Sequence, residues 1–226
     1  MMGVRTDRNL RYLFLTHGVM GVDDILSGQR KRKLRSKKRK LEATGLVEFT
    51  EERPFYNVSQ TIDECLALEA SGWKGGEFTD TKSNINNQKF VHDFCSNFAK
   101  ERQLLIHKLK FNDSTIACQI GFCVDKTYYF YKVGYDPCYA ETSPSIQLFQ
   151  TSSESLAKQG INRIEFLGVD DQWKIDLSNG LTETISLWFY PFTIQGMLGY
   201  VKNLITRLRL RFQLIHERLI NLYRTS

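Results

Sequence analysis

The sequence predicts an α/β protein built on a mixed β-sheet, and two observations carry this expectation. Two runs with alternating side chains and a third, strongly aromatic run follow one another between residues 105 and 135, separated by short turn signals, which indicates an antiparallel meander. The helical stretch Pro144–Gln159 then leads to a further strand at Arg163–Leu167. A crossover of that length permits the two strands to pair in parallel, which makes the sheet mixed.

The residues ahead of the meander predict mainly helices. Residues 1–21 show no clear period and stay unassigned. Residues 22–45 predict a basic helix, because Asp23 and Asp24 suit its first turn and strong helix formers follow. The next expected elements are a short strand at 46–52 and helices at 59–71 and 88–102.

The meander has strong local signals. Asn112-Asp113-Ser114 and Asp125-Lys126 mark its two turns, and a strongly aromatic strand, Tyr128–Tyr135, closes it. Gly160 suits the end of the crossover helix, and a last strand is expected at 183–191. We therefore expect residues 46–192 to form one domain. The alternating apolar positions of the first two strands are Leu105, His107, Leu109 and Phe111, then Ile116, Cys118, Ile120 and Phe122.

Residues 193–226 predict a long amphipathic helix. Its apolar residues recur alternately three and four positions apart. Such a stripe either packs on the sheet of its own domain or forms a coiled coil with a second copy, giving a homodimer. The stripe consists of Leu198, Val201, Ile205, Leu208, Phe212, Ile215, Leu219 and Leu222.

The positive charge is confined to two segments. The net charge is +6, but Arg30–Lys40 alone carries nine basic residues, and residues 202–226 add six against one Glu. Residues 41–201 hold 13 Lys and Arg against 21 Asp and Glu. The overall charge is therefore a poor argument for nucleic-acid binding. The basic run itself could bind RNA, DNA or an anionic membrane surface, although no aromatic residues interleave with it for base stacking.

Cysteine usage favours a reducing compartment. The five cysteines show no C-x-x-C pair and no histidine at metal-ligand spacing, which predicts free thiols and no metal site. The apolar stretch 187–205 is interrupted by Pro191, Gln195 and Lys202, well short of a membrane span. We expect a cytoplasmic protein, with peripheral contact at the inner membrane as an alternative. The cysteines are Cys65, Cys95, Cys118, Cys123 and Cys138.

Four strings of the sequence carry a family resemblance. They are LSGQRKRKLRSKKRKLEATGLVEF (26–49), LEASGWKGG (68–76), SPSIQLF (143–149) and EFLGVDDQWK (165–174). In this order they resemble the CelD-like acetyltransferases, a branch of the GNAT superfamily related to the FemAB aminoacyl transferases and often linked to cellulose or exopolysaccharide production. Family members are usually longer, so the chain looks like their C-terminal half. The resemblance implies the GNAT fold and acyl-CoA, in particular acetyl-CoA, as co-substrate.

The resemblance also implies where the acyl donor binds. The cleft would open between the splayed strands Tyr128–Tyr135 and Arg163–Leu167, with the pyrophosphate on the turn before the crossover helix. Ser143 suits the N-cap and Pro144 the first helical position, which leaves backbone N–H groups for an anion; an ordinary capped helix fits the same residues. The glycine-rich loop of typical GNAT enzymes is absent here. The residues implied in donor binding are Tyr135, Asp136, Ser143 and Ser145.

Residues for catalysis and for the acceptor follow from the same resemblance. Glu165, on the second splayed strand, is the candidate base, and Lys174 of the Trp-Lys pair is the candidate for stabilising an oxyanion or phosphates. Trp73 and Lys74 match a family signature and would shape the acceptor cleft. A surface lysine, a strand-end carboxylate and a core tryptophan are the alternative interpretations of these residues.

Three functions are thus open. The first is an N-acyltransferase that moves an acyl group from acyl-CoA to a primary amine in polysaccharide or cell-envelope biosynthesis, with an amino sugar, peptide or lipid-linked precursor as acceptor. The second is a FemAB-like transferase that uses aminoacyl-tRNA, with the basic helix holding the tRNA. The third is a non-enzymatic module that binds nucleic acid or membranes through the basic helix.

Overall fold

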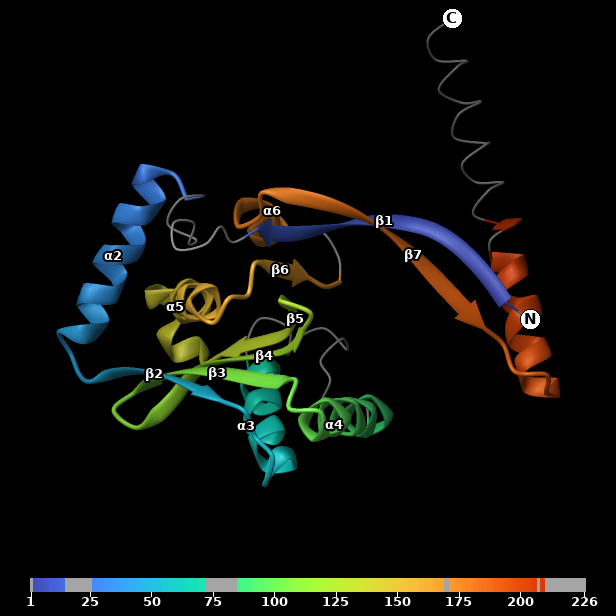
Figure 1. The fold of residues 1–226 in the computed structure, drawn as a ribbon, viewed down its shortest axis with the longest axis horizontal. Helices are drawn as coiled ribbons and strands as arrows, with labels where there is room; N and C mark the ends of the chain where they lie inside the picture. The colour runs from blue at the N-terminus through green and yellow to red at the C-terminus, as the bar shows by residue number, and fades with distance from the viewer. Residues whose placement is uncertain (1, 15–25, 72–84, 169–170, 207, 210–226) are drawn as a thin grey trace, which may run out of the picture. The chain divides into compact units, whose positions relative to one another are not determined.

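Figure 1 shows the computed structural model of the chain, which describes residues 2–14, 26–71, 85–168, 171–206 and 208–209. The chain divides into two compact units, residues 9–182 and residues 1–8 with 183–226. The larger unit contains the features that bear on function. The smaller unit holds the outer parts of two strands and a helix over 194–206.

The described strands form a seven-stranded sheet in the order β2-β3-β4-β5-β6-β1-β7. β3, β4 and β5 pair antiparallel in sequence, and β5 pairs parallel to β6, which confirms the predicted meander and mixed sheet. Both meander turns have positive φ at Asn112-Asp113 and Asp125-Lys126, as two-residue hairpin turns require. The strands are β1 (Met2–Phe14), β2 (Val47–Glu52), β3 (Leu104–Phe111), β4 (Ser114–Val124), β5 (Thr127–Tyr135), β6 (Arg163–Phe166) and β7 (Gly180–Phe189).

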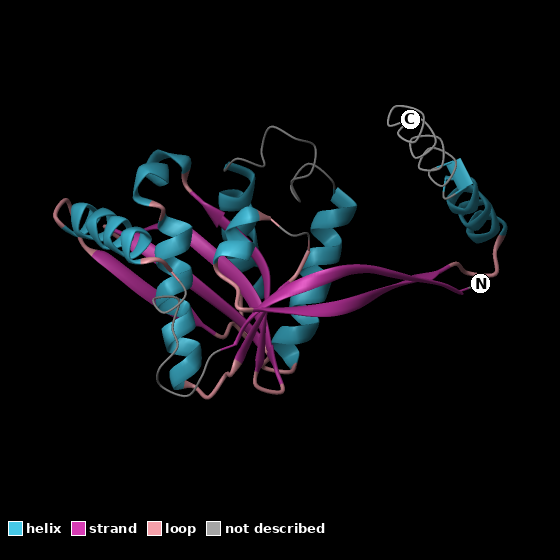
Figure 2. Cartoon of the chain, turned by 90° about the horizontal axis from the view of Figure 1, so that it is seen from above, coloured by secondary structure: helices cyan, strands magenta, loops and turns pink. Residues whose placement is uncertain are grey.

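Helices cover both faces of this sheet (Figures 1 and 2). α3 (Val58–Ser71) and α4 (Ile85–Lys100) pack on one face, where Ile62 and Cys95 are buried completely. α5 (Pro144–Lys158) packs on the other, with Phe149 against Phe130 and Phe166. The remaining helical segments of the larger unit are α2 (Gly28–Glu42), the 3-10 helix η3 (Pro137–Thr142) and α6 (Gln172–Asp176).

A chain of polar groups is buried between the sheet and α5. His107 is completely buried, with Nε2 3.3 Å from Glu51 Oε2, and Gln119 Nε2 donates to the Tyr128 hydroxyl at 3.0 Å. Burial lowers the pKa of His107, and the adjacent His107 ring lowers the pKa of Glu51 to about 2. Ser155 of α5 donates to the same carboxylate at 2.7 Å, which ties the helix to β2.

Two assignments in the first part of the chain differ from the sequence expectations. Residues 2–14 form β1, which pairs antiparallel with β6 from Arg11↔Phe166 to Phe14↔Arg163. The polar run Arg5–Asn9 hides this strand, because it lacks the alternation that marks a half-buried strand. The basic helix begins at Gly28, where the Ser27 hydroxyl accepts from the Arg30 N–H, and residues 22–25 lie outside the described residues.

The expectation of free thiols is wrong for two cysteines. Cys65 of α3 and Cys118 of β4 form a disulfide, with Cα atoms 5.4 Å apart. Their 53-residue separation gives no sign of the pairing, which arises because α3 crosses β4 with both side chains in one core cluster. Cys95, Cys123 and Cys138 are free.

The C-terminal helix exposes its apolar stripe as far as it is described. Leu198, Val201, Ile205 and Leu208 are each about half exposed or more. Residues 210–226, with the second half of the stripe, lie outside the described residues, so the coiled-coil pairing stays a prediction. No helix in the described parts of the chain is long and apolar enough to span a membrane.

Candidate active site

The central feature of the site is the point where β5 and β6 part. The two strands pair in parallel from Thr127↔Arg163 to Phe130↔Phe166, and within the described residues the pairing ends there. Beyond this point β5 continues to Tyr135, while β6 gives way to Leu167 and Gly168. The edge of β5 that faces β6 therefore presents backbone groups to a gap beyond Phe130. The sequence resemblance implied such a gap between these two strands.

A β-bulge marks the same point on the other edge of β5. Ile120 pairs with Lys132 and Gly121 with Phe130, so Tyr131 is an extra residue. A bulge reverses the alternation of side chains along a strand. Phe130 consequently packs on the α5 side, whereas Lys132 faces α3. Without the bulge, Lys132 would point to the same side as Phe130.

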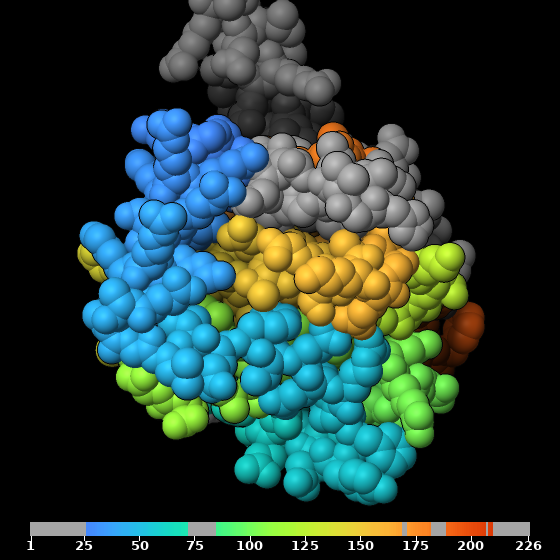
Figure 3. Space-filling model, turned by 60° about the vertical axis from the view of Figure 1, so that its left-hand side comes forward, coloured from blue at the N-terminus to red at the C-terminus, as the bar shows by residue number. Residues whose placement is uncertain are grey.

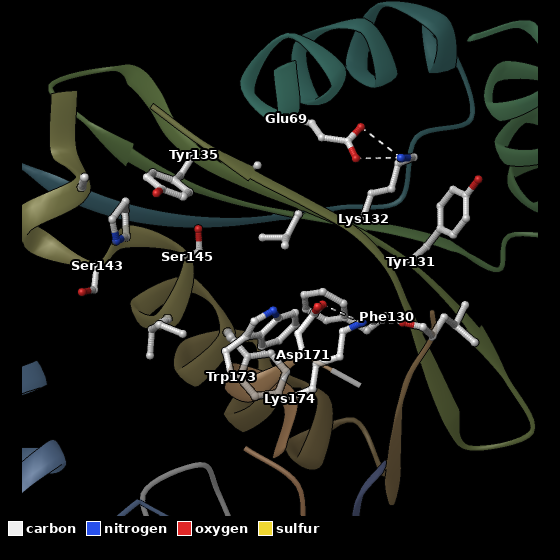
Figure 4. A pocket seen from close by; sticks show the side chains of 17 residues that line it. Glu69, Phe130, Tyr131, Lys132, Tyr135, Ser143, Ser145, Asp171, Trp173 and Lys174 are labelled. Carbon is white, nitrogen blue, oxygen red and sulfur yellow. Dashed lines mark hydrogen bonds and ion pairs between the residues drawn. The ribbon is translucent and has the colours of Figure 1, made fainter. Parts of the chain in front are cut away.

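The gap opens into a cavity of about 280 Å³, shown in Figure 4. Its walls come from β5, the start of α5, the end of β6, α6 and the last turn of α3, all within the larger unit. A cavity of this size is at the lower end of small-molecule sites and suits the reactive end of a larger ligand. Its polar lining residues are Glu69, Tyr131, Lys132, Tyr135, Ser143, Ser145, Asp171, Trp173 and Lys174.

One end of the cavity is the N-terminus of α5. Ser143 adopts a left-handed conformation (φ 55°) and its side chain makes no capping bond, while Pro144 takes the first helical position. The Ser143 hydroxyl instead accepts a hydrogen bond from Lys37 Nζ at 2.8 Å, and the Ser145 hydroxyl is buried with no hydrogen-bond partner among the described residues. Helix N-termini attract anions, and a lysine beside one strengthens that attraction.

Lys37 reaches this position because one face of α2 packs on the body of the unit. Leu34 and Leu41 of that face are buried, and Arg30 forms an ion pair with Asp176 of α6 at 2.9 Å. In Figure 3 the blue surface of α2 borders the yellow surface of α5. α2 therefore lies along the rim between the two helices that wall the cavity.

A second wall of the cavity is formed by the Trp173-Lys174 pair of α6. Lys174 is buried, and its Nζ donates to the Leu167 carbonyl at 2.8 Å and lies 3.3 Å from Asp171 Oδ2. The same ammonium lies 5.5 Å from the centre of the Trp173 ring. These contacts tie α6 to Leu167, the residue that follows β6.

A third wall carries an ion pair between α3 and β5. Lys132 Nζ donates to both carboxylate oxygens of Glu69, at 2.8 and 3.0 Å. Gly134 permits the close approach of α3, because a Cβ there would lie 2.3 Å from the Glu69 backbone nitrogen. Tyr131 lies beside the pair, and burial raises the pKa of its phenol to about 12, so it is protonated at neutral pH.

The structure brings together some of the residues that the sequence predicted for the site. Lys174 lines the cavity, whereas Glu165 does not and instead forms an ion pair with Arg163 on β6. Trp73 and Lys74 lie outside the described residues. Of the four predicted donor-binding residues, Tyr135, Ser143 and Ser145 line the cavity. Asp136 does not line it, and its carboxylate instead accepts a hydrogen bond from the Cys138 N–H at the start of η3.

Sequence reasoning missed three charged residues of the site. Lys37 was one of nine basic residues in a run and had no individual signal. Lys132 is placed by the bulge, which no local pattern announces. Glu69 lies within the string LEASGWKGG, and a carboxylate at an apolar position of the predicted helix 59–71 was the available sign. No cluster of three or more His, Cys, Asp or Glu residues in the described part of the chain is arranged to hold a metal ion.

Comparisons with known proteins agree with this geometry. A family profile described as "Acetyltransferase (GNAT) domain" matches residues 28–175. No curated protein matches the sequence. Among solved structures, a conserved protein of unknown function from Bacteroides thetaiotaomicron is 15% identical with a TM-score of 0.54, covering 83% of this chain and 61% of that one. The chain thus spans less than two thirds of that relative's length.

Two further solved structures match parts of the chain. L-PGS from Bacillus licheniformis is 12% identical with a TM-score of 0.50, covering 90% of this chain and 67% of that chain. The PaiA N-acetyltransferase from Thermoplasma acidophilum, solved in complex with coenzyme A, is 11% identical with a TM-score of 0.39 over 50% of this chain and 75% of that one. At 12% identity, the similarity to L-PGS shows a shared fold and nothing more.

Proposed function

Because the chain belongs to the family of GNAT acetyltransferase domains, we propose that it transfers an acyl group, in the simplest case acetyl, from acyl-CoA to a primary amine. The observation that carries the proposal is the parting of β5 from β6 beyond Phe130, which opens a cavity from the N-terminus of α5 to the charged wall on α3. The resemblance to CelD-like enzymes supports an acceptor from polysaccharide or cell-envelope biosynthesis.

In this proposal the donor enters at the α5 end of the cavity. Its pyrophosphate binds the backbone N–H groups at the start of α5, with the Ser145 hydroxyl and the Lys37 ammonium as further donors. Its acylated arm lies in the gap between the strands, where a backbone N–H of β5 beyond the bulge donates to the thioester carbonyl. Such a preorganised donor stabilises the negative charge that develops on that oxygen.

The chemistry is direct transfer. The neutral amine attacks the thioester carbon, a tetrahedral intermediate forms, and the C–S bond breaks as the thiolate leaves. The amine nitrogen loses one proton and the thiolate gains one, which gives amide and free thiol. Lys174 is a candidate to stabilise negative charge, since its ammonium lies in the cavity wall. The pairing of Glu165 with Arg163, away from the cavity lining, does not support a role for Glu165 as base.

Calorimetric titration of the protein with acetyl-CoA tests the proposal. We expect saturable one-to-one binding that Ser145→Glu weakens at least tenfold, because a carboxylate would stand where the phosphate binds. Ser36→Glu on the exposed side of α2 adds the same charge outside the cavity and is the matched control. Absence of binding by the folded wild-type protein, or equal losses in the two variants, would contradict the proposal.

A second candidate function has one specific observation in its favour. The outer face of α2 exposes more positive charge than the phosphates of one CoA molecule require. Transfer from aminoacyl-tRNA would use this surface, since the tRNA backbone could run along α2 while its acylated end enters the cavity. Titration with tRNA at increasing salt concentration tests this. An affinity that falls steeply with salt in the wild-type protein, and a much weaker salt dependence after charge reversal on the outer face of α2, would favour tRNA over CoA. The exposed basic residues of that face are Arg32, Lys33, Arg35, Lys38, Arg39 and Lys40.

A further inference from the structure

The Glu69–Lys132 ion pair lies in the wall of the cavity. The Glu69 side chain is 5% exposed and the Lys132 side chain 17%, yet both line the cavity. Figure 4 shows the pair along one wall, with Ser143 and Ser145 at another end and Trp173 and Lys174 facing from below. The pair therefore lines the same cavity as the proposed donor site, from the α3 side of β5.

Two unusual backbone features place the pair there. The bulge at Tyr131 turns Lys132 toward α3, and the absence of a side chain at Gly134 lets the last turn of α3 approach β5 closely enough for Glu69 to meet it. On an ordinary strand at an ordinary packing distance, Lys132 would point away from α3 and the two charges would not meet.

Stability alone gives no reason for this arrangement. Removing two charges from water is unfavourable, and replacing a buried ion pair by apolar side chains is often neutral or stabilising. A comparable pair on the same helix, Glu64 with Lys108 at 2.7 Å, lies outside the cavity, and its carboxylate is nearly half exposed. The Glu69–Lys132 pair differs by being desolvated and by facing a cavity in which a ligand can share its hydrogen bonds.

We infer that the pair recognises the acceptor, and that the acceptor is a primary amine with an anionic group, a carboxylate or a phosphate, near the amine. This inference rests on the proposed acyl transfer. The amine donates an N–H to the Glu69 carboxylate, which directs its lone pair toward the donor carbonyl, and the anionic group accepts from the Lys132 ammonium. Each partner then exchanges one charge-assisted hydrogen bond for another.

The geometry also argues against other acceptors. A diamine or polyamine would bring a second positive charge next to Lys132, and like charges in a desolvated site repel. A neutral amino sugar would donate to Glu69 but would offer no negatively charged acceptor to the Lys132 ammonium. An amino acid, an amino-terminal acidic peptide unit or a phosphorylated amino sugar supplies both charges.

Matched acceptor pairs test the inference, with thiol release from acetyl-CoA as the readout. The pairs are alanine against alaninamide and glucosamine 6-phosphate against glucosamine, which differ in the negative charge. We expect the preferred anionic acceptor to have a kcat/KM at least tenfold above its neutral counterpart. Lys132→Met should reduce that ratio to about one while acetyl-CoA binding persists. Glu69→Gln should lower kcat/KM for both members of a pair.

Glu64→Gln is the control, because it removes an ion pair of the same type from the same helix outside the cavity. It should leave the acceptor ratio unchanged. Binding of the same acceptor pairs to the protein–CoA complex, followed by saturation-transfer NMR, gives a readout that requires no turnover.

The outcomes separate the inference from the proposed function. If the wild-type protein binds no acetyl-CoA, the proposed acyl transfer fails and the inference fails with it. If the donor binds but the neutral acceptors bind or react as well as the anionic ones, or no acceptor binds, only the inference is overturned. Persistence of the anionic preference in Lys132→Met overturns it as well.

Discussion

Substitution of Gly134 by alanine tests how the charged wall of the cavity is built. The added methyl carbon would lie 2.3 Å from the Glu69 nitrogen and 2.6 Å from the Leu68 carbonyl carbon. Normal contact would require α3 to move outward by about 1 Å, since helix backbone atoms cannot rotate away as a side chain can. Overpacking of this kind destabilises a protein by about 1–3 kcal/mol.

Two effects set the expected size of the change. The clash with backbone places the native-state penalty in the upper part of that range, at about 2–3 kcal/mol. Loss of the conformational freedom of glycine in the unfolded chain offsets about 0.4–1 kcal/mol of it. The net expectation is a decrease of about 1–2.6 kcal/mol in the free energy of unfolding. Acceptor discrimination should also weaken, because Glu69 moves away from Lys132.

Urea denaturation followed by circular dichroism measures this change. Gly28→Ala is the control, because a Cβ at Gly28 in α2 meets nothing within 4 Å. It should leave stability unchanged or raise it by up to about 1 kcal/mol. A Gly134→Ala variant as stable as the wild type would refute the close approach of α3 to β5 and, with it, the explanation of how Glu69 reaches the cavity.

Two other predictions concern stability. The folded state binds fewer protons than the unfolded state at both Glu51 and His107, because both pKa values are lowered in the fold. The free energy of unfolding should therefore fall on acidification, first below about pH 6.5 as His107 gains a proton, and again between pH 4.5 and 2 as Glu51 does. Urea unfolding midpoints measured from pH 7 to pH 2 check this, and midpoints that stay constant or rise as the pH falls would contradict it. The Cys65–Cys118 disulfide closes a loop of 53 residues, so its reduction should lower the free energy of unfolding by about 2–4 kcal/mol. Intact-mass measurement after alkylation, with and without reductant, checks the bond itself, and five alkylated cysteines without reductant would show that it does not form.

The meander and the crossover were predictable because their signals are local. Alternating apolar residues and the turns at Asn112-Asp113 and Asp125-Lys126 specify hairpins from neighbouring residues alone. The start of α5 was equally readable, since Pro144 suits a first helical position. β1 was not predictable, because its pairing with β6 joins residues that lie far apart in the sequence. Its polar run also lacks the alternation that marks a strand.

The charged part of the site depends on long-range geometry and so escaped prediction. Lys132 would point to the α5 side on a regular strand, and only the bulge at Tyr131 turns it to α3. Lys37 bonds Ser143 from 106 residues away, and nothing in a uniform basic run distinguishes it from its neighbours. Family resemblance supplied the position of the cleft, whereas the residues that line it from α2 and α3 required the fold.

The central claim is that an acyl donor occupies the gap between β5 and β6, with its phosphates at the start of α5. Backbone amide NMR of the ¹⁵N-labelled protein during titration with acetyl-CoA tests this most directly. We predict that the largest shifts fall on Lys132–Tyr135 and on Ser145, with little change at the exposed positions of α2. Shifts confined to α2, or the absence of any shift in β5 and α5 at saturating donor, would contradict the claim.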